Sequence, residues 1–402
     1  MWCGPRAVVA DWEAARPSSR RGRLLALTAV VAAVVAVGAV VVVRDARAPA
    51  PDLQIDRPTD DDAVTTPLSE VAWPRPQPGL WRYMPDAPLT PRIGHAMVWG
   101  GNAVFIWGGF DITGLPLTDG GLFDAATGAW ELLPPYDGGD ATASYVAWSG
   151  AQVFVVSATV TQVFDPQRAA WTAFPPPPLP DGHVLTDQVV GTGDGVIALS
   201  TPGRSVETPR PAMFRLAHGE PAWRRLSDPP VSVSDGDVVL ADTDRVVVHA
   251  RGAGGRSPAT AELDLRRRGA HWQAVTVPPG LGDQLLARLL GAVADDRAVL
   301  VGIGAPGARG YAAVHDGRRW RRTDPPPLPP SPQVDGLWIG DGLIVWDRLT
   351  GVGARLDLAS ARWTRFSASP VADGAPRPAV WTGSSIVTWG GFRPAGAVYR
   401  VR

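Results

Sequence analysis

A tryptophan returns at near-regular intervals through most of this 402-residue chain. The intervals are 49, 41, 52, 49, 48 and 43 residues, and the members are Trp81, Trp130, Trp171, Trp223, Trp272, Trp320 and Trp363. A period of this length, with β-type sequence in each unit, is typical of β-propellers, whose four-stranded blades bury their faces only by stacking on neighbours. The seven units therefore predict an all-β fold, a seven-bladed β-propeller.

Each unit also holds two apolar β runs joined by a tight turn. The turns lie around Asn102, Gly150, Asp194, Asp244, Asp296, Asp341 and Ser384. The runs that precede them begin at Ala96, Tyr145, Gln188, Asp237, Leu289, Gly336 and Ala379. Turns of this kind favour residues that accept a positive φ, so the flanking runs predict strands A and B of each blade. A short strand ending in Asp, as in Phe123-Asp124, then leads to the Trp, and these two segments predict strands C and D.

The phase of the two repeats predicts how the ring closes. Trp81 precedes the first hairpin, whereas the last hairpin is followed only by residues 397–402. One strand is therefore missing at the C-terminal end, and we expect residues 80–83 to supply strand D of the seventh blade. Closure of this kind leaves few exposed strand edges.

The first and last units carry further motifs. The first has Pro91-Arg92-Ile93-Gly94-His95, then Trp107-Gly108-Gly109-Phe110, then an aromatic-Asp, Thr-Gly, Trp run over residues 123–130; the last repeats Pro376-Arg377 and Trp389-Gly390-Gly391-Phe392. These motifs resemble the Kelch-repeat family of propellers, including the central domain of galactose-oxidase-like proteins. The resemblance spans residues 81–402 but is strong only at the two ends. It implies a propeller and leaves the function open, because Kelch-type propellers serve both as binding platforms and as parts of enzymes.

Cysteine usage excludes one activity of that family. Galactose oxidase, which this fold resembles, needs a copper site with a cysteine-crosslinked tyrosine. The only cysteine here is Cys3, which lies outside the predicted propeller. No cofactor is therefore expected on this ground.

Residues 24–43 form an uninterrupted apolar stretch of the length that crosses a bilayer as a helix. Arg16, Arg20, Arg21 and Arg23 precede it, so the positive-inside bias predicts a cytoplasmic tail over residues 1–23 and a propeller outside the cell membrane. A cleaved signal peptide is the alternative, although the apolar run is longer than a usual signal-peptide core. Residues 44–78 are rich in Pro and Asp and predict a disordered linker, followed by the propeller at 79–402.

The connections between strands differ between the two faces of the predicted disc. A–B and C–D turns share one face, called here the turn face, and are short; B–C loops and D–A linkers share the other, the loop face, and include the long segment 109–121. Variable loops on a rigid scaffold are where binding usually occurs. We therefore place the ligand at the loop face, with candidate contacts Arg92, His95, Phe110, Asp111, Arg377 and Phe392.

The catalytic and metal-binding motifs of other families are missing from the sequence, so no catalytic residue and no metal site is predicted. The six His are scattered without paired-ligand spacing, and Asp235, Asp237, Asp242 and Asp244 are better explained as turn residues than as a calcium site. The net charge of −1 argues mildly against a nucleic-acid partner.

Three functions are compatible with the sequence. The leading one is a non-catalytic, membrane-anchored propeller that binds a protein or a cell-envelope glycan. The alternative is a carbohydrate-active enzyme, a sugar isomerase or oxidase, that works at the opening of the central channel. Glutamate is scarce in the propeller and absent from the predicted A strands, which disfavours the enzyme. A third is signalling through the cytoplasmic tail.

Overall fold

A computed structural model of the chain describes residues 77–136, 144–202, 211–230, 238–241, 245–250, 258–266, 271–283, 285–294, 297–331 and 333–401. The chain divides into two units, residues 1–69 and 70–402, and every described residue belongs to the second. The predicted tail, transmembrane helix and almost all of the predicted linker lie outside the described residues, as do Asp235, Asp237, Asp242 and Asp244. In the described part of the chain, no helix has both the length and the apolar character needed to span a membrane.

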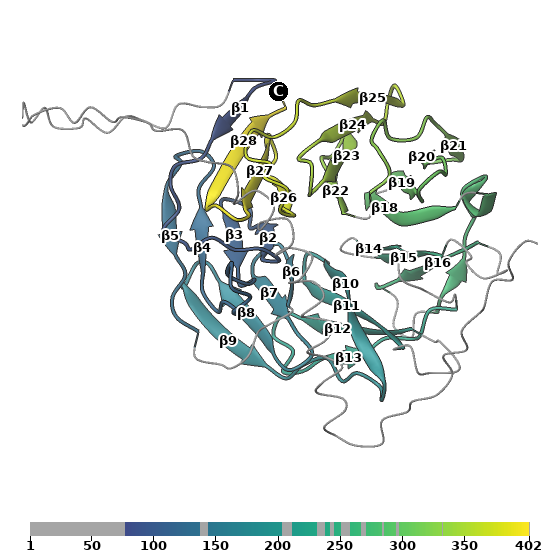
Figure 1. Cartoon of the computed structure of the whole chain (residues 1–402). Coiled ribbons are helices and arrows are strands. Elements are labelled where there is room, and N and C mark those ends of the chain that lie inside the picture. The colour runs from purple at the N-terminus through teal and green to yellow at the C-terminus, as the bar shows by residue number, and fades with distance from the viewer. Residues whose placement is uncertain are drawn as a thin grey trace, which may run out of the picture. The chain divides into compact units, whose positions relative to one another are not determined.

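The second unit is the predicted seven-bladed β-propeller. Seven antiparallel four-stranded sheets surround an axis, and the innermost strands of neighbouring blades contact one another all the way round (Figure 1). Within each blade, strands A to D follow one another from the axis outward. Strand B is buried along its whole length in blades 1, 2, 6 and 7, because neighbouring blades cover both of its faces. This explains the continuous apolar runs in the sequence.

The first three blades have these bounds. Blade 1 comprises β2 (Ala96–Trp99), β3 (Val104–Trp107), β4 (Gly120–Phe123) and β5 (Trp130–Leu132). Blade 2 comprises β6 (Tyr145–Trp148), β7 (Val153–Val156), β8 (Thr161–Asp165) and β9 (Ala170–Phe174). Blade 3 comprises β10 (His183–Gly191), β11 (Gly195–Pro202), β12 (Ala212–Ala217) and β13 (Arg224–Arg225).

The remaining four blades follow the same order. Blade 4 comprises β14 (Val238–Ala241), β15 (Arg245–Ala250), β16 (Ala259–Asp264) and β17 (Gln273–Ala274), and the short 3₁₀ helix η1 (Leu281–Asp283) follows it. Blade 5 comprises β18 (Leu286–Ala294), β19 (Arg297–Gly304), β20 (Tyr311–Asp316) and β21 (Trp320–Arg322). Blade 6 comprises β22 (Val334–Trp338), β23 (Gly342–Asp347), β24 (Gly353–Asp357) and β25 (Arg362–Arg365). Blade 7 comprises β26 (Ala379–Trp381), β27 (Ser385–Gly390), β28 (Ala395–Arg400) and β1 (Trp81–Tyr83).

The predicted closure is confirmed by the pairing of β1 with β28. Trp81 lies opposite Tyr399 and Tyr83 opposite Ala397, so the N-terminal strand completes blade 7. The Gly79 amide donates to the Arg400 carbonyl at 2.8 Å, which extends the contact beyond the strand. Because strand D starts where strand C ends, the described chain begins on the turn face.

The recurring tryptophans join each blade to the one before it. Five indole N–H groups donate to a carbonyl that follows strand D of the preceding blade: Trp81 to Ser367 (2.8 Å), Trp130 to Pro85 (3.2 Å), Trp171 to Pro134 (3.0 Å), Trp272 to Ser227 (2.8 Å) and Trp363 to Asp324 (2.7 Å). The indole of Trp223 donates to the Thr161 hydroxyl at 3.0 Å. These residues are therefore blade-to-blade contacts rather than an exposed aromatic platform.

The aspartate that ends strand C closes the C–D turn. Asp124 Oδ1 accepts from the Ala126 amide at 2.7 Å, and Asp165 Oδ1 accepts from the Gln167 amide at 2.9 Å. Asp264, Asp316 and Asp357 accept backbone amides in the same way. The aspartate of the aromatic-Asp motif thus stabilises the C–D turn.

We expect the seam between the chain ends to contribute measurably to stability. Trp81→Phe removes the indole N–H and is expected to lower the free energy of unfolding by about 1 kcal/mol. Trp81→Ala also removes ring contacts with Trp346 and Tyr399, at centroid distances of 5.6 and 5.1 Å, and is expected to cost about 3 kcal/mol. Urea unfolding measures both. The control Leu80→Ala changes a side chain that is 57% exposed, and an effect as large as that of Trp81→Ala would contradict the role of the seam.

Candidate functional site

A cavity of about 690 Å³ lies on the axis of the ring, enclosed by the inner strands of six blades. Its walls come from β2, β6, β10, β18, β22 and β26. The later parts of these strands line it with apolar side chains such as Met97, Val293 and Trp338. The charged side chains sit near the start of the strands, which places them at the mouth on the loop face.

Two of these charged side chains project from β-bulges. The register of β10 against β11 shifts between Leu185 and Val189, and that of β18 against β19 shifts between Leu286 and Arg288. Bulges re-aim side chains, and here they accompany Asp187 and Arg288, which meet with Arg288 Nη2 3.0 Å from Asp187 Oδ2. This ion pair joins blade 3 to blade 5 across the mouth of the cavity.

Arg348 provides a second cation at the mouth. Its backbone is fixed between two blades, since its amide donates to the Gln333 carbonyl at 2.7 Å and its carbonyl accepts from the Arg377 amide at 2.8 Å. Its Nε lies 3.7 Å from Asp335 Oδ2, which is too long for a hydrogen bond, and its guanidinium makes no hydrogen bond with the described residues. Arg348 therefore keeps donors for a ligand.

The carboxylate of Asp335 is electrostatically unusual. Burial raises its pKa above the ordinary value of an aspartate; the positive charges of Arg348 and Arg288 oppose this shift, and the negative charge of Asp187 adds to it. The mouth thus holds two carboxylates of different character, one paired at 3.0 Å with arginine and one held more loosely.

His95 lines the cavity and is buried, and neither ring nitrogen makes a hydrogen bond of good geometry with the described residues. Its ring packs against Gly390, where any Cβ would overlap it, and edge-on against Trp389 at 5.5 Å. Burial and the charges of Arg92, Arg348 and Arg377 lower its pKa to about 3, so the imidazole is neutral. The double glycine of blade 7 therefore makes room for a side chain of blade 1.

The two predicted arginines are engaged by their own surroundings. Arg92 is fully buried, and its guanidinium donates to the carbonyls of Thr90, Gly108 and Asp119 and to the Asp119 carboxylate at 3.0 to 3.2 Å. Arg377 donates to the Gly390 carbonyl and the Asp373 carboxylate, each at 2.6 Å. Both side chains therefore stabilise loops of the loop face through hydrogen bonds to their carbonyls and carboxylates.

The other three candidates lie at the rim. Phe110 pairs with Ile93 through two backbone hydrogen bonds of 2.9 Å, and Asp111 Oδ1 caps its own loop by accepting from the amides of Thr113 and Leu115. Phe392 is 49% exposed in the B–C turn of blade 7. The structure therefore places His95 in the wall of the cavity, whereas these three residues lie in loops of the same face and do not line it.

The four charged residues of the mouth are not among the residues predicted from the sequence. Asp187, Arg288 and Asp335 each stand one residue before an apolar run that marks an A strand, so they fall just outside the predicted strands. Glutamate was the acid expected to face the channel of an enzyme, whereas the acids present are aspartates. A charge at the start of an otherwise apolar inner strand is the signal that identifies them.

No protein-family model and no curated protein sequence matches the chain. A solved structure titled "Structure of YjhT" aligns with 79% of this chain and 99% of its own length, at 15% sequence identity and a TM-score of 0.41. A similarity of this size supports no argument about the site. The propeller assignment rests on the strand pairing of the chain itself.

Buried neutral histidines predict a loss of stability in acid. In the folded protein the pKa of His95 is about 3, and burial lowers the pKa of His249 to about 4. In the unfolded chain both side chains take up protons near pH 6.5. Their contribution is therefore complete above pH 6.5 and is lost as the pH falls toward the folded values. From pH 7 to pH 5, each histidine is expected to lower the free energy of unfolding by about 2 kcal/mol. Urea unfolding at both pH values measures this loss.

The matched variants are His95→Gln and the double variant with His249→Gln. The first is expected to lose about 2 kcal/mol less than the wild type on acidification, and the second about 4 kcal/mol less. An acid-dependent loss that is the same in all three proteins would show that these side chains do not carry it.

Proposed function

We propose that the chain is a membrane-anchored, extracytoplasmic propeller of diverged Kelch type that binds a protein or a cell-envelope glycan at its loop face. The anchor is the apolar segment 24–43, and its flanking arginines support the orientation. Kelch-type motifs in the first and last units support the family proposal. The binding role rests on the cavity mouth.

The observation that carries the proposal is the guanidinium of Arg348. It lies at the mouth of a 690 Å³ cavity, 26% exposed, with its nearest carboxylate at 3.7 Å and no hydrogen bond to the described residues. Arginine binds carboxylates through two parallel N–H donors, so a guanidinium with free donors suits a ligand carrying a carboxylate. We therefore expect an acidic glycan or an acidic peptide segment.

The surroundings of the mouth favour a macromolecular ligand. Several exposed large apolar side chains lie in B–C loops of the loop face, namely Ile112, Leu115, Leu349 and Phe392. On the opposite face, Leu80, which precedes strand D of blade 7, is exposed to this degree, whereas the described A–B and C–D turns expose no such side chain. Exposed apolar side chains on the same face as a polar cavity mouth are typical of binding surfaces.

Replacing Arg348 tests this proposal. An array of uronic-acid oligosaccharides and aspartate-rich peptides identifies a binder of the wild-type protein, and Arg348→Ala is expected to weaken that binder at least tenfold because a charge-assisted pair is lost. Arg318→Ala, an exposed arginine in a C–D turn, is the control and leaves the affinity unchanged. Equal affinity of Arg348→Ala and wild type would show that the cavity mouth is not the site.

A second candidate is the carbohydrate-active enzyme, in the form of a sugar isomerase. The observation in its favour is the pair Asp335 and Asp187, since burial raises the pKa of Asp335 while Asp187 lies 3.0 Å from Arg288 in an ion pair. A carboxyl group whose pKa is raised can donate a proton near neutral pH, and a neighbouring carboxylate can accept one.

Asp335→Asn separates the two functions, because it removes the proton but keeps the shape. For an isomerase, the rate of anomer interconversion of an acidic sugar, followed by NMR, is expected to fall about 100-fold with little change in affinity. For a binding module, wild type and variant show the same uncatalysed rate. Asp194→Asn, in an A–B turn of blade 3, is the control.

A further inference from the structure

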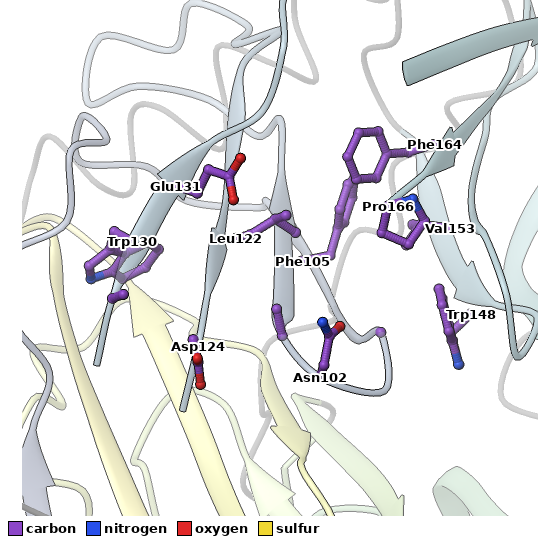
Figure 2. Close-up of a pocket in the computed structure, with 13 residues that line it drawn as sticks. Asn102, Phe105, Leu122, Asp124, Trp130, Glu131, Trp148, Val153, Phe164 and Pro166 are labelled. Carbon is purple, nitrogen blue, oxygen red and sulfur yellow. The ribbon is translucent and has the colours of Figure 1, made fainter. Parts of the chain in front are cut away.

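A second cavity, of about 510 Å³, lies between blades 1 and 2 and opens on the turn face. Blade 1 contributes Asn102 from its A–B turn and Asp124 and Glu131 from either side of its C–D turn, and blade 2 contributes Trp148 and Phe164 (Figure 2). It lies on the face opposite the channel mouth. We call it the blade 1–2 cleft.

The floor and one wall of this cleft are aromatic. Phe105 and Phe164 are fully buried, with ring centroids 5.8 Å apart. Trp148 is half-buried and packs against the A–B turn of blade 1, where a Cβ on Gly101 would stand 3.6 Å from its ring. The turn thus fixes the indole at the edge of the cleft, beside Asn102.

The rim of the blade 1–2 cleft carries two carboxylates and no basic side chain. Burial opposes ionisation of Asp124, but hydrogen bonds from the Thr127 side chain and from the Ala126 and Thr127 amides lower its pKa below the ordinary value. Glu131 is exposed, and its carboxylate makes no ion pair or hydrogen bond with the described residues. A cleft with an apolar, aromatic floor and two carboxylates that form no ion pair is a chemical match for a cation with an apolar stem.

The other blades show what normally accompanies this aspartate. In four of them, an arginine of the same blade pairs with the aspartate that ends strand C: Arg168 with Asp165 (2.7 Å), Arg266 with Asp264 (3.3 Å), Arg321 with Asp316 (3.3 Å) and Arg355 with Asp357 (3.6 Å). Asp124 has no such partner among the described residues. These arginines stand in the C–D turn, in strand D or in strand C, and in blade 1 none of these places carries an arginine that pairs with Asp124.

Blade 6 supplies a direct template for the occupant. Arg355 lies opposite Ile344 in the register of its blade, and Leu122 lies opposite Phe105 at the same position of blade 1. The guanidinium of Arg355 stands 2.9 Å from Asp341 in the A–B turn and 3.6 Å from Asp357, with its side chain 14% exposed.

The residues of blade 1 that correspond to Asp341 and Asp357 are Asn102 and Asp124. Both line the cleft, and Leu122 is too short and apolar to fill it as Arg355 fills blade 6. Blade 1 therefore keeps polar residues at both positions that contact Arg355 in blade 6. Asn102 stands in place of Asp341, Asp124 in place of Asp357, and Leu122 in place of the arginine.

We propose that the blade 1–2 cleft binds an arginine side chain of a partner polypeptide. The guanidinium lies between Asp124 and Glu131, and the methylene stem covers Leu122. Arginine is preferred over lysine because its planar group bonds a carboxylate through two parallel donors. This interaction is independent of the channel ligand, since it uses the other face and no residue of the mouth.

The test uses the full chain in detergent micelles and a blocked Gly-Gly-Arg-Gly-Gly peptide as the probe, with binding measured by titration calorimetry. Peptides with citrulline or lysine in place of arginine keep the size but remove the charge or the planar fork. We expect saturable binding of the arginine peptide and at least tenfold weaker binding of the citrulline peptide. Asp124→Asn and Glu131→Gln are each expected to weaken the arginine peptide about tenfold.

Two further variants guard against misfolding as an explanation. Leu122→Arg combined with Asn102→Asp rebuilds in blade 1 the internal pair of blade 6, so the protein is expected to keep its unfolding transition and lose the peptide. Asp357→Asn, whose arginine is internal, is expected to bind the peptide as the wild type does.

Three results would overturn the proposal. The first is binding of the citrulline peptide as tight as that of the arginine peptide, and the second is undiminished binding by the rebuilt variant. The third is binding that appears only after Arg57 and Arg75 are replaced by alanine, which would assign the cleft to this chain's own arginines instead of a partner's.

Discussion

The contact between a strand-D tryptophan and the preceding blade is the interaction on which the ring depends. Strand B of several blades is buried on both faces, so such a blade has no face that could remain in water by itself. The indole supplies apolar area to the next interface, and its N–H, bonded to a carbonyl of the preceding blade, fixes how far one blade turns against another. Trp81 makes this contact with Ser367, so the seam is held as the other interfaces are.

The same contact explains which parts of the molecule could be predicted from sequence. Trp130 and Asp124 belong to positions that repeat, and a repeated position reports a repeated environment, so fold, blade number and closure all followed. Asp187, Arg288 and Asp335 stand at similar places in their blades but differ in charge, and a single sequence does not show the bulges beside the first two. The mouth could not be predicted because it is built from the places where the blades differ.

The two arginine candidates show how little a motif says about contacts. Arg92 and Arg377 belong to family-like motifs beside double glycines, and the motif does not show which groups accept from their side chains. Their partners Asp119 and Asp373, with the carbonyls of Gly108 and Gly390, take up their donors, and those contacts depend on how the loops fold back. Gly391 is needed because the guanidinium of Arg377 occupies the space of its missing side chain.

Departures from the repeat also give the two faces opposite chemistry. At the mouth of the axial cavity, the guanidinium of Arg348 lies 3.7 Å from Asp335 without a hydrogen bond to the described residues, an arrangement that suits an anion. In blade 1, Leu122 stands in strand C where blade 6 has Arg355, and Asp124 has no arginine partner among the described residues, an arrangement that suits a cation. Because blades 1 and 6 keep the same backbone register through these exchanges, the ring can change its surface charge without changing its packing. The core consists of strand B and the tryptophans. Charged side chains at the cavity mouth and at the position of Leu122 are not part of this core, so the charge there can change while the blades stay packed.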